Sequence, residues 1–372
     1  MLTRVETFFS RDVADFRARL SQLDASLDTS LPATRNQTYR DLAEAMHAIE
    51  AACRRLESTI GANPDLLAET QQRFQAETAE FFDKSWIGSR ARTKPRGYPG
   101  DYLLLNTIYD EQPKSPGLGG YIDLYIMDMV LAHSVRARWQ AIRQFLSDEL
   151  ARRRENVSIL NVACGPCREY VAGINDVGAS NVRITCLDND PEALDFVQTK
   201  IAPTAPGISE LKCTRYNALR MKSADATIRN FGRSDIIYSI GLCDYIEDRY
   251  MIEMLAGWRE SLSDDGVLFV AFKDARRYDK TPYQWLLDWH FYQRTEEDCR
   301  RLFEQAGFNM DGLETTRDAT GVIINFVSRT RVATPVRVDT AETIGAPHIT
   351  PAGERAQRDA GVATNSTSSE TP

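Results

Sequence analysis

Hydrophobic positions in the first part of the chain follow a helical period. Up to about residue 84, apolar residues recur three and four positions apart, as at Val5, Phe8, Phe9, Val13, Phe16 and Leu20. This spacing predicts amphipathic helices. Residues 89–120 are rich in glycine and proline, so we expect an irregular link there. A further helical pattern runs from Tyr121 to about Arg153. The pattern predicts an N-terminal helical domain over residues 1–118, with residues 94–110 as a lid loop.

The second half of the chain changes to short runs of β-branched residues, most of them separated by helical patterns. Seven such runs occur, at residues 158–163, 183–187, 211–216, 235–240, 267–272, 309–315 and 322–328. Strands that alternate with helices predict a parallel sheet with helices on both faces. The last two runs are joined by a turn too short for a crossover helix, so the seventh strand should run antiparallel beside the sixth. We predict an α/β domain over residues 119–330 with a Rossmann-like seven-stranded sheet.

Residues 331–372 differ in composition from the rest of the chain. They are rich in Ala, Thr, Pro, Gly and Ser and have hardly an aromatic residue, so we predict a disordered tail. No apolar run reaches the roughly 18 residues needed to span a bilayer, and the N-terminus lacks the pattern of a secretory signal. We therefore expect a cytoplasmic protein with no membrane span.

The net charge and the cysteine content indicate which binding partners and which thiol state to expect. The 372 residues carry a net charge of −8, which disfavours nucleic acid as a partner and favours a small molecule. The seven cysteines are an odd number in apolar contexts, as expected for reduced and mostly buried thiols. A homodimer is compatible with the sequence, which leaves the oligomeric state open.

The segment VACGPCREY, Val162–Tyr170, contains a Cys-x-x-Cys pair that would suit a thioredoxin-like dithiol. The rest of the pattern favours another chemistry. The next strand ends in ITCLDND, which places Asp188 23 residues after Gly165. A glycine turn after one strand and a carboxylate after the next are typical of a nucleoside-binding βαβ unit, in which the acid binds the ribose hydroxyls. We interpret Asn161 as closing the strand and the two cysteines as turn residues.

Five segments together resemble the successive motifs of class I S-adenosylmethionine-dependent methyltransferases. They are ILNVACGPCRE, ITCLDND, YNAL, SDIIYSIGLCDYIED and SDDGVLFVAF. The resemblance covers roughly residues 121–330. Asn161, Ala163 and Cys167 stand where the family has an acid and two glycines, and Gly165 keeps the middle glycine. KPRGYPGDYLLLNTIYD and DWHFYQRT add a narrower likeness to the bacterial family named for 3-hydroxypalmitic acid methyl ester synthesis.

This resemblance implies S-adenosylmethionine as the cofactor and assigns its contacts. Asp188 would bind the ribose, with Asn189 beside the adenine, although an acid here can also cap the next helix, a role that suits Asp190 better. Asn217 would meet the adenine amine, unless it is an ordinary turn residue. The remaining cofactor contacts would come from Asn161, Ala163, Gly165, Ala218, Ser239 and Gly241.

The lid and an aromatic segment supply candidates for the rest of the site. In GYPGD, Tyr98 would stack over the methionine end and Asp101 would meet its charges, although the segment also suits a plain linker. Tyr245 should face the acceptor. His290 and Arg294 lie four apart, which would put them on one helical face as polar groups of the acceptor wall. The four histidines show no metal-ligand spacing, so no metal site is expected.

The leading hypothesis is a methyltransferase acting on a small molecule, with carboxyl O-methylation of a hydroxy fatty acid as its specific form. One alternative is an N- or O-methyltransferase of an amino-acid-like or natural-product acceptor. Another is a protein that binds S-adenosylmethionine without catalysis.

Overall fold

A computed structural model describes residues 1–32, 34–171, 173–176 and 178–330. They belong to one compact unit, Met1–Val332. The predicted tail, residues 331–372, lies outside the described residues. Within the described part, no helix is both long and apolar enough to cross a membrane.

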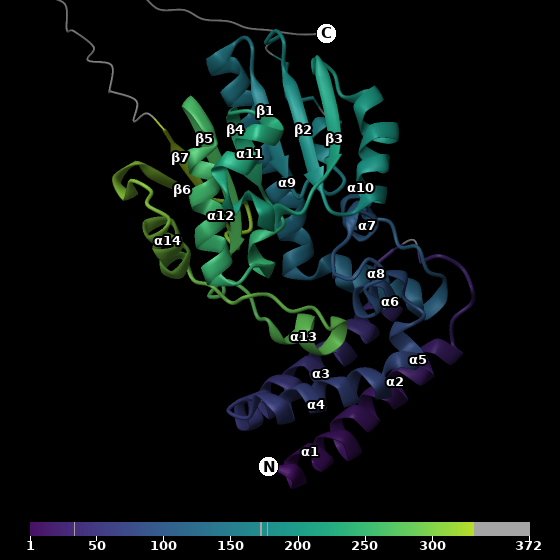
Figure 1. The fold of residues 1–372 in the computed structure, drawn as a ribbon. Coiled ribbons are helices and arrows are strands. Elements are labelled where there is room, and N and C mark those ends of the chain that lie inside the picture. Colours follow the sequence, from purple (N-terminus) through teal and green to yellow (C-terminus); the bar gives the residue numbers. More distant parts are fainter. Residues whose placement is uncertain (33, 172, 177, 331–372) are drawn as a thin grey trace, which may run out of the picture. The chain divides into compact units, whose positions relative to one another are not determined.

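Seven strands form one sheet in the order β3-β2-β1-β4-β5-β7-β6 (Figure 1). Their bounds are β1 Ser158–Val162, β2 Arg183–Asp188, β3 Glu210–Arg215, β4 Ser234–Ser239, β5 Leu262–Lys273, β6 Leu313–Arg317 and β7 Ile323–Arg329. All neighbours pair in parallel except β7, which runs antiparallel to both β5 and β6. The predicted Rossmann-like methyltransferase sheet, including its antiparallel last strand, is confirmed.

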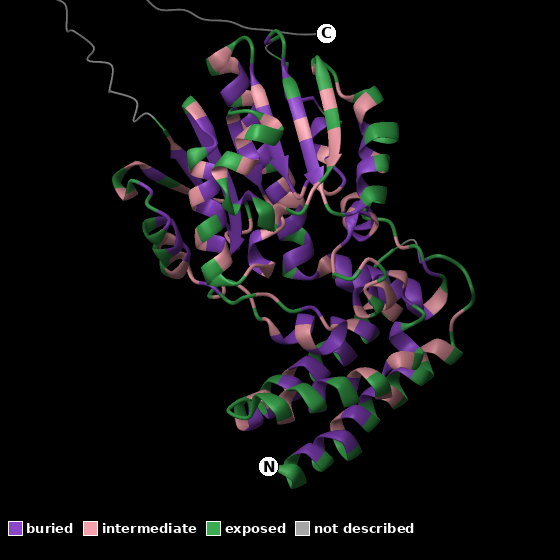
Figure 2. Cartoon of the chain, viewed as in Figure 1, coloured by how far each residue is buried: buried purple, intermediate pink, exposed green. Residues whose placement is uncertain are grey.

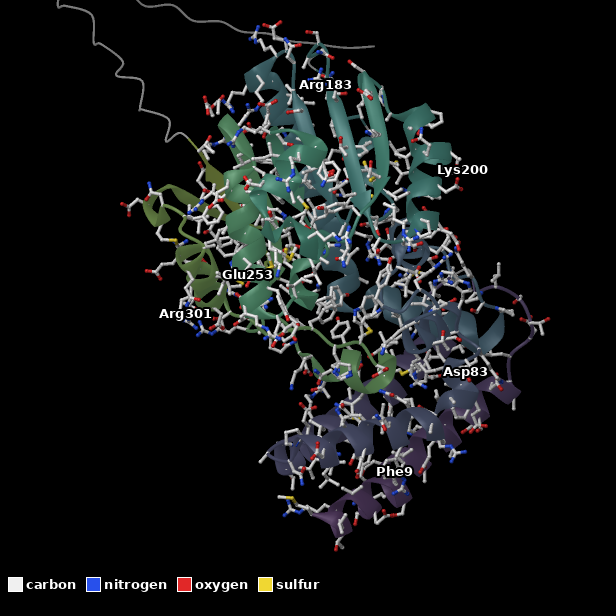
Figure 3. All side chains as sticks on the ribbon, in the orientation of Figure 1. Phe9, Asp83, Arg183, Lys200, Glu253 and Arg301 are labelled. Carbon is white, nitrogen blue, oxygen red and sulfur yellow. The ribbon has the colours of Figure 1, made fainter. Side chains whose placement is uncertain are left out.

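Helices cover both faces of this sheet. They are α9 Val130–Arg153, α10 Pro191–Phe196, α11 Ala224–Phe231, α12 Asp248–Glu260 and α14 Glu296–Gln305. The apolar face of α9 packs on one side of β1, β4 and β5, and α12 and α14 pack on the other. Figure 2 shows the buried central strands, and Figure 3 shows the exposed side chains of Lys200 and Arg301 pointing outward from the helical layers.

The N-terminal part is helical, as predicted. Its helices are α1 Leu2–Thr7, α2 Ala14–Ala25, α3 Gln37–Ile60, α4 Pro64–Glu77, α5 Ala79–Phe82, α6 Trp86–Thr93, α7 Tyr102–Asp110 and α8 Gly117–Asp128, with a π-helical turn at Phe8–Val13 between α1 and α2. Their core continues past residue 118 into the start of α9 and into α13, Thr281–Leu287. The division of the chain at residue 118 stays a prediction.

Two expectations about the helical part were wrong. The segment expected to be an irregular link contains α7, because the Asp101 carboxylate accepts hydrogen bonds from the backbone of Leu103 and Leu104 and so caps a helix. The long helical pattern after Tyr121 is two helices, because Met129 is extended (φ −66°, ψ 149°) and separates α8 from α9.

Candidate functional site

A cavity of about 300 Å³ lies at the carboxyl ends of the parallel strands. Its lining residues come from the loops after β1 to β4, from the end of β5, and from α7, α8, α9, α13 and the segment before α7. Ligands of open α/β sheets bind at this edge, where loops from several strands converge. The position makes this cavity the candidate functional site.

The loop after β1 is held in an unusual backbone conformation. Ala163, Gly165 and Cys167 have φ values of 55°, 54° and 49°, in the left-handed region that favours glycine. The Cys164 backbone N–H donates to Leu187 O at 2.9 Å, and that of Gly165 donates to the Asp188 carboxylate at 3.0 Å. The end of β2 therefore fixes the loop, and two non-glycine residues carry strain of the kind that clusters at functional sites.

Asp188 and Asp190 have separate roles. One Asp188 oxygen accepts the Gly165 N–H and the other accepts the Asp190 N–H at 3.0 Å, and burial raises the pKa of Asp188 above its ordinary value of 3.8. Asp190 caps α10 by accepting the Glu192 N–H at 3.0 Å. The capping role expected of Asp190 is confirmed, and Asp188 lines the cavity with Asn189.

Asn217 was expected either to contact the adenine or to be an ordinary turn residue, and its position is compatible with both. Its side chain accepts the Leu219 N–H at 3.0 Å and so caps a short 3-10 helix, Ala218–Lys222. It also lines the cavity, together with Ala218 and, from the loop after β4, Gly241. The structure thus brings together eight of the predicted cofactor residues, namely Tyr98, Ala163, Gly165, Asp188, Asn189, Asn217, Ala218 and Gly241.

Asn161 and Ser239 lie elsewhere. Both are buried inside the sheet and do not line the cavity. Asn161 donates to Glu169 at 3.3 Å and to the Tyr170 hydroxyl at 3.1 Å, and Ser239 donates to Val162 O at 2.9 Å. Their side chains hold strands and loop in place.

The segment before α7 closes one side of the cavity. Tyr98, Pro99 and Gly100 line it, and a Cβ on Gly100 would approach Trp289 to 2.5 Å, so only glycine fits there. Asp101 does not reach the cavity, because it is 1% exposed and pairs with Arg90 at 2.7 Å besides capping α7.

The part of the cavity beyond Gly241 is largely apolar. Its wall consists of Leu105, Ile108, Ile126, Leu131, Ala132, Val135, Leu242, Tyr245, Ile246, Tyr283, Leu287, Trp289 and Phe291. The polar atoms of its aromatic residues are satisfied within the wall, since Trp289 Nε1 donates to the Tyr245 hydroxyl at 2.7 Å and Leu131 N–H donates to the Tyr283 hydroxyl at 2.9 Å. Burial raises the pKa of Tyr245, so its hydroxyl stays protonated at neutral pH.

Two buried cations stand in this apolar part. Lys273, which is 5% exposed, donates to Asp244 at 2.5 Å, and burial lowers the pKa of Lys273. Arg138 is 4% exposed, and its Nε has no hydrogen-bond partner. Its guanidinium lies beside Gly241, 3.7 Å from where a Cβ would stand. Within the described part of the chain no salt bridge to Arg138 is seen, but its charge interacts with the buried Glu169 carboxylate and its guanidinium with the Tyr109 hydroxyl, while Nε is left without a partner.

The sequence analysis missed both cations, although the sequence carries a signal for each. Arg138 interrupts the apolar face of α9 between Val135 and Ile142, and Lys273 ends the apolar run of β5. A charge on a buried face is expensive unless it is paired, which marks such a residue for attention.

The helical placement of His290 and Arg294 was wrong. Helix α13 ends at Leu287, because Asp288 takes a left-handed conformation (φ 50°), and the chain continues without helical structure. The His290 side chain is 50% exposed and contacts Asp288 at 3.1 Å. Arg294 is buried and donates to Cys243 O at 2.9 Å and to the Asp248 carboxylate at 2.7 Å. Neither residue lines the cavity.

The Cys-x-x-Cys pair does not resemble a reactive dithiol. Burial raises the pKa of Cys167 well above its ordinary value, whereas hydrogen bonds from Cys167 and Cys186 lower the pKa of Cys164. Both residues are buried, which keeps their sulfurs from an external disulfide.

Comparison with known proteins gives a likeness in fold. No protein-family model and no curated protein matches the chain. Among solved structures, a possible exported protein from Bordetella parapertussis is 20% identical, with a TM-score of 0.50 over 62% of this chain and 79% of that one. At this identity the likeness bears on the fold alone.

Two named methyltransferases are also similar. Magnesium protoporphyrin IX methyltransferase from Synechocystis PCC 6803, with bound S-adenosylhomocysteine, is 13% identical over 54% of this chain and 86% of that one, with a TM-score of 0.41. The CurJ carbon methyltransferase is 9% identical over 89% of this chain and 92% of that one, with a TM-score of 0.45. At these scores they carry no argument about the activity of this chain.

Proposed function

We propose that this chain is an S-adenosylmethionine-dependent methyltransferase that methylates the carboxylate of a small amphipathic acid, with a hydroxy fatty acid as the expected acceptor. One observation carries the proposal. A single cavity joins the loop after β1 and the Asp188 carboxylate to an apolar compartment that contains a buried arginine, Arg138, whose Nε has no hydrogen-bond partner.

The residues at the strand ends fit the cofactor. Asp188 offers a carboxylate for the ribose hydroxyls, and Asn217 and Ala218 would flank the adenine. A Cβ on Gly165 would meet only Leu105, at 3.8 Å, so the loop leaves open space for a nucleoside to approach. When bound, S-adenosylmethionine supplies an activated methyl group on a sulfonium, and the protein has to align the acceptor and exclude water.

The apolar compartment fits an acid with a hydrocarbon chain. Arg138 would bind the acceptor carboxylate through charge-assisted hydrogen bonds, using the Nε donor that has no partner in the protein. The aliphatic and aromatic wall would cover the chain and exclude water. A carboxylate is already ionised at neutral pH, so no residue has to remove a proton.

The same groups are less suited to a hydroxyl or amine acceptor. Such an acceptor needs a general base. Tyr245 is protonated at neutral pH, Lys273 is engaged by Asp244, and His290 lies outside the cavity. Tyr245 is therefore assigned to the wall. The cytoplasmic location and the homodimer remain predictions from the sequence.

An assay of the chemical bond formed tests this proposal. The full chain is incubated with methyl-labelled S-adenosylmethionine and with matched pairs of long-chain acids and alcohols. A carboxyl methyl ester releases labelled methanol in alkali, whereas an ether or a methylated amine does not. The proposal predicts label from the acids only, and alkali-stable product would refute it.

A further inference from the structure

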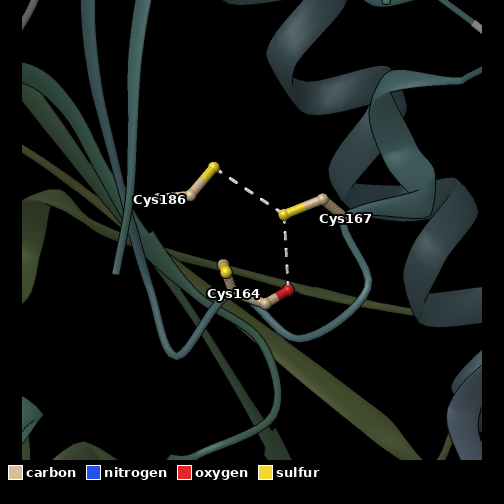
Figure 4. A group of neighbouring side chains, drawn as sticks. All are labelled: Cys164, Cys167 and Cys186. Carbon is tan, nitrogen blue, oxygen red and sulfur yellow. Dashed lines mark hydrogen bonds between the residues drawn. The ribbon is translucent and has the colours of Figure 1, made fainter. Parts of the chain in front are cut away.

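Three cysteine sulfurs gather behind the loop after β1 (Figure 4). Cys164 and Cys167 come from that loop, and Cys186 comes from the neighbouring strand β2. The three Sγ atoms all lie within 4.8 Å of one another, and those of Cys167 and Cys186 are 3.8 Å apart. Among the described residues, no histidine or carboxylate belongs to this group, and the Cys213 thiol of β3 lies beside Cys186 but outside the group. The residues that line the cavity do not include these cysteines, so the group is separate from the proposed active site.

The backbone is shaped to bring the sulfurs together. Cys167 has a left-handed conformation (φ 49°), which is strained for a residue other than glycine. Cys164 is tied to the end of β2 through its N–H bond to Leu187 O. The Asn161 amide lies 3.5 Å from the Cys167 sulfur and can donate to it. A donor to a sulfur orients and stabilises it as a ligand.

The spacing matches that of ligands around one ion. With an ion–sulfur bond of about 2.3 Å, sulfurs around one ion lie roughly 3.4 Å apart in a pyramidal complex and up to about 4.0 Å apart in a planar one. The Cys167–Cys186 distance lies within this range, and small side-chain rotations would bring Cys164 to it. Soft thiolate ligands select soft ions.

We propose that Cys164, Cys167 and Cys186 form a three-sulfur site for a soft, thiophilic ion that needs no fourth ligand. The sequence analysis expected no metal site because it weighed histidine spacing, whereas this site needs the pairing of β1 with β2 to complete it. The inference does not depend on the proposed function.

The net charge of the bound complex favours one kind of ion over the others. Each sulfur that binds gives up its proton, so three bonds to a monovalent, divalent or trivalent ion leave a net charge of −2, −1 or 0. The site is buried next to Asp188, and an uncompensated negative charge there is costly. A trivalent ion gives a neutral complex. Trivalent arsenic in its hydroxide form reacts with three thiols to give three arsenic–sulfur bonds and three water molecules, without oxidation or reduction.

All three residues are buried, and Cys164, at 8% exposed, is the least covered of them. An ion would meet Cys164 first and pass to the other two sulfurs.

Titration of the reduced full chain with arsenite tests this inference. We expect one arsenic bound per chain, and X-ray absorption should show three sulfur ligands and no oxygen. Zinc and monovalent copper should bind more weakly than arsenite. Two sulfur ligands, no binding, or tighter binding of zinc would each overturn the proposal.

Variants of single cysteines test whether arsenite binds at these three residues. Cys186→Ser and Cys186→Ala should each weaken arsenite binding by more than about 100-fold, since loss of a ligand exceeds the loss of a supporting hydrogen bond. Cys299→Ser, which removes a buried thiol outside the group, is the matched control and should bind as the parent does. Unchanged binding in whichever Cys186 variant folds would overturn the site, and the X-ray absorption result on the parent chain stands independently of folding.

Discussion

Replacement of Arg138 by methionine separates a binding role from a structural one. Methionine retains an unbranched apolar chain comparable to the aliphatic stem of arginine and lacks the charged guanidinium. If Arg138 binds the acceptor carboxylate, the variant should lose acceptor affinity. Because the guanidinium makes no salt bridge in the described part of the chain, its removal should lower the melting temperature only by the loss of its interactions with Glu169 and Tyr109.

The expected magnitude follows from burial. Hydrogen bonds to charged groups contribute about 1.5 to 3 kcal/mol. At 4% exposure water screens the Arg138 charge little, so the upper part of this range applies. A loss of about 2 to 3 kcal/mol raises the dissociation constant of the acid roughly 30- to 150-fold. The affinity for S-adenosylhomocysteine should stay unchanged, since Arg138 lies on the acceptor side of the cavity.

Calorimetric titration with a long-chain acid and with the alcohol of the same length measures this effect. The variant should lose affinity for the acid and little for the alcohol. Arg294→Met is the matched control, because Arg294 is buried outside the cavity and donates to Cys243 O and Asp248. It should lower the melting temperature and leave acid binding intact. Equal acid affinity in the parent and Arg138→Met would refute the role of Arg138.

Three further predictions concern single side chains. Asp188→Asn should weaken S-adenosylhomocysteine binding by about 2 kcal/mol in calorimetry, whereas Asp190→Asn, which keeps the helix cap, should not; equal effects would contradict the ribose assignment. Burial raises the pKa of Glu50 above its ordinary value of 4.5, so the folded chain binds this proton more tightly and stability falls as pH rises above 4.5. Glu50→Gln should therefore gain melting temperature relative to the parent between about pH 5 and 8 and lose that gain below about pH 4; a constant difference would contradict this. His290→Gln should leave kcat and its pH profile unchanged, because the ring is half-exposed outside the cavity; loss of turnover together with a parent pKa of about 6 to 7 would point to a hydroxyl or amine acceptor.

The sheet could be predicted from the sequence because its signals are local. Runs of β-branched residues mark the strands, and the short turn after the sixth strand fixes the direction of the seventh. The first and last residues of the strands were harder to predict. β6 begins at Leu313 rather than near Asn309, because the Asn309 side chain accepts the Asp311 N–H and starts a 3-10 turn.

The residues on the cofactor side of the cavity could also be predicted largely from local sequence patterns. Apart from Tyr98, the predicted residues that line the cavity lie at or just after the ends of strands, and parallel strands bring such residues to one edge of the sheet. The residues on the acceptor side of the cavity could not be predicted from local sequence patterns. Arg138 reaches the cavity only because α9 packs across the sheet beside Gly241, and His290 leaves it because one residue, Asp288, ends a helix that the spacing seemed to continue. A spacing of four residues predicts a shared face only if the helix persists.

A crystal structure of the full chain with S-adenosylhomocysteine tests the central claim most directly. The account predicts the ribose hydroxyls on the Asp188 carboxylate, the adenine beside Asn217 and Ala218, and the sulfur directed toward the compartment that contains Arg138. A ligand bound away from Asp188, or a cavity that stays empty at saturating ligand, would contradict it.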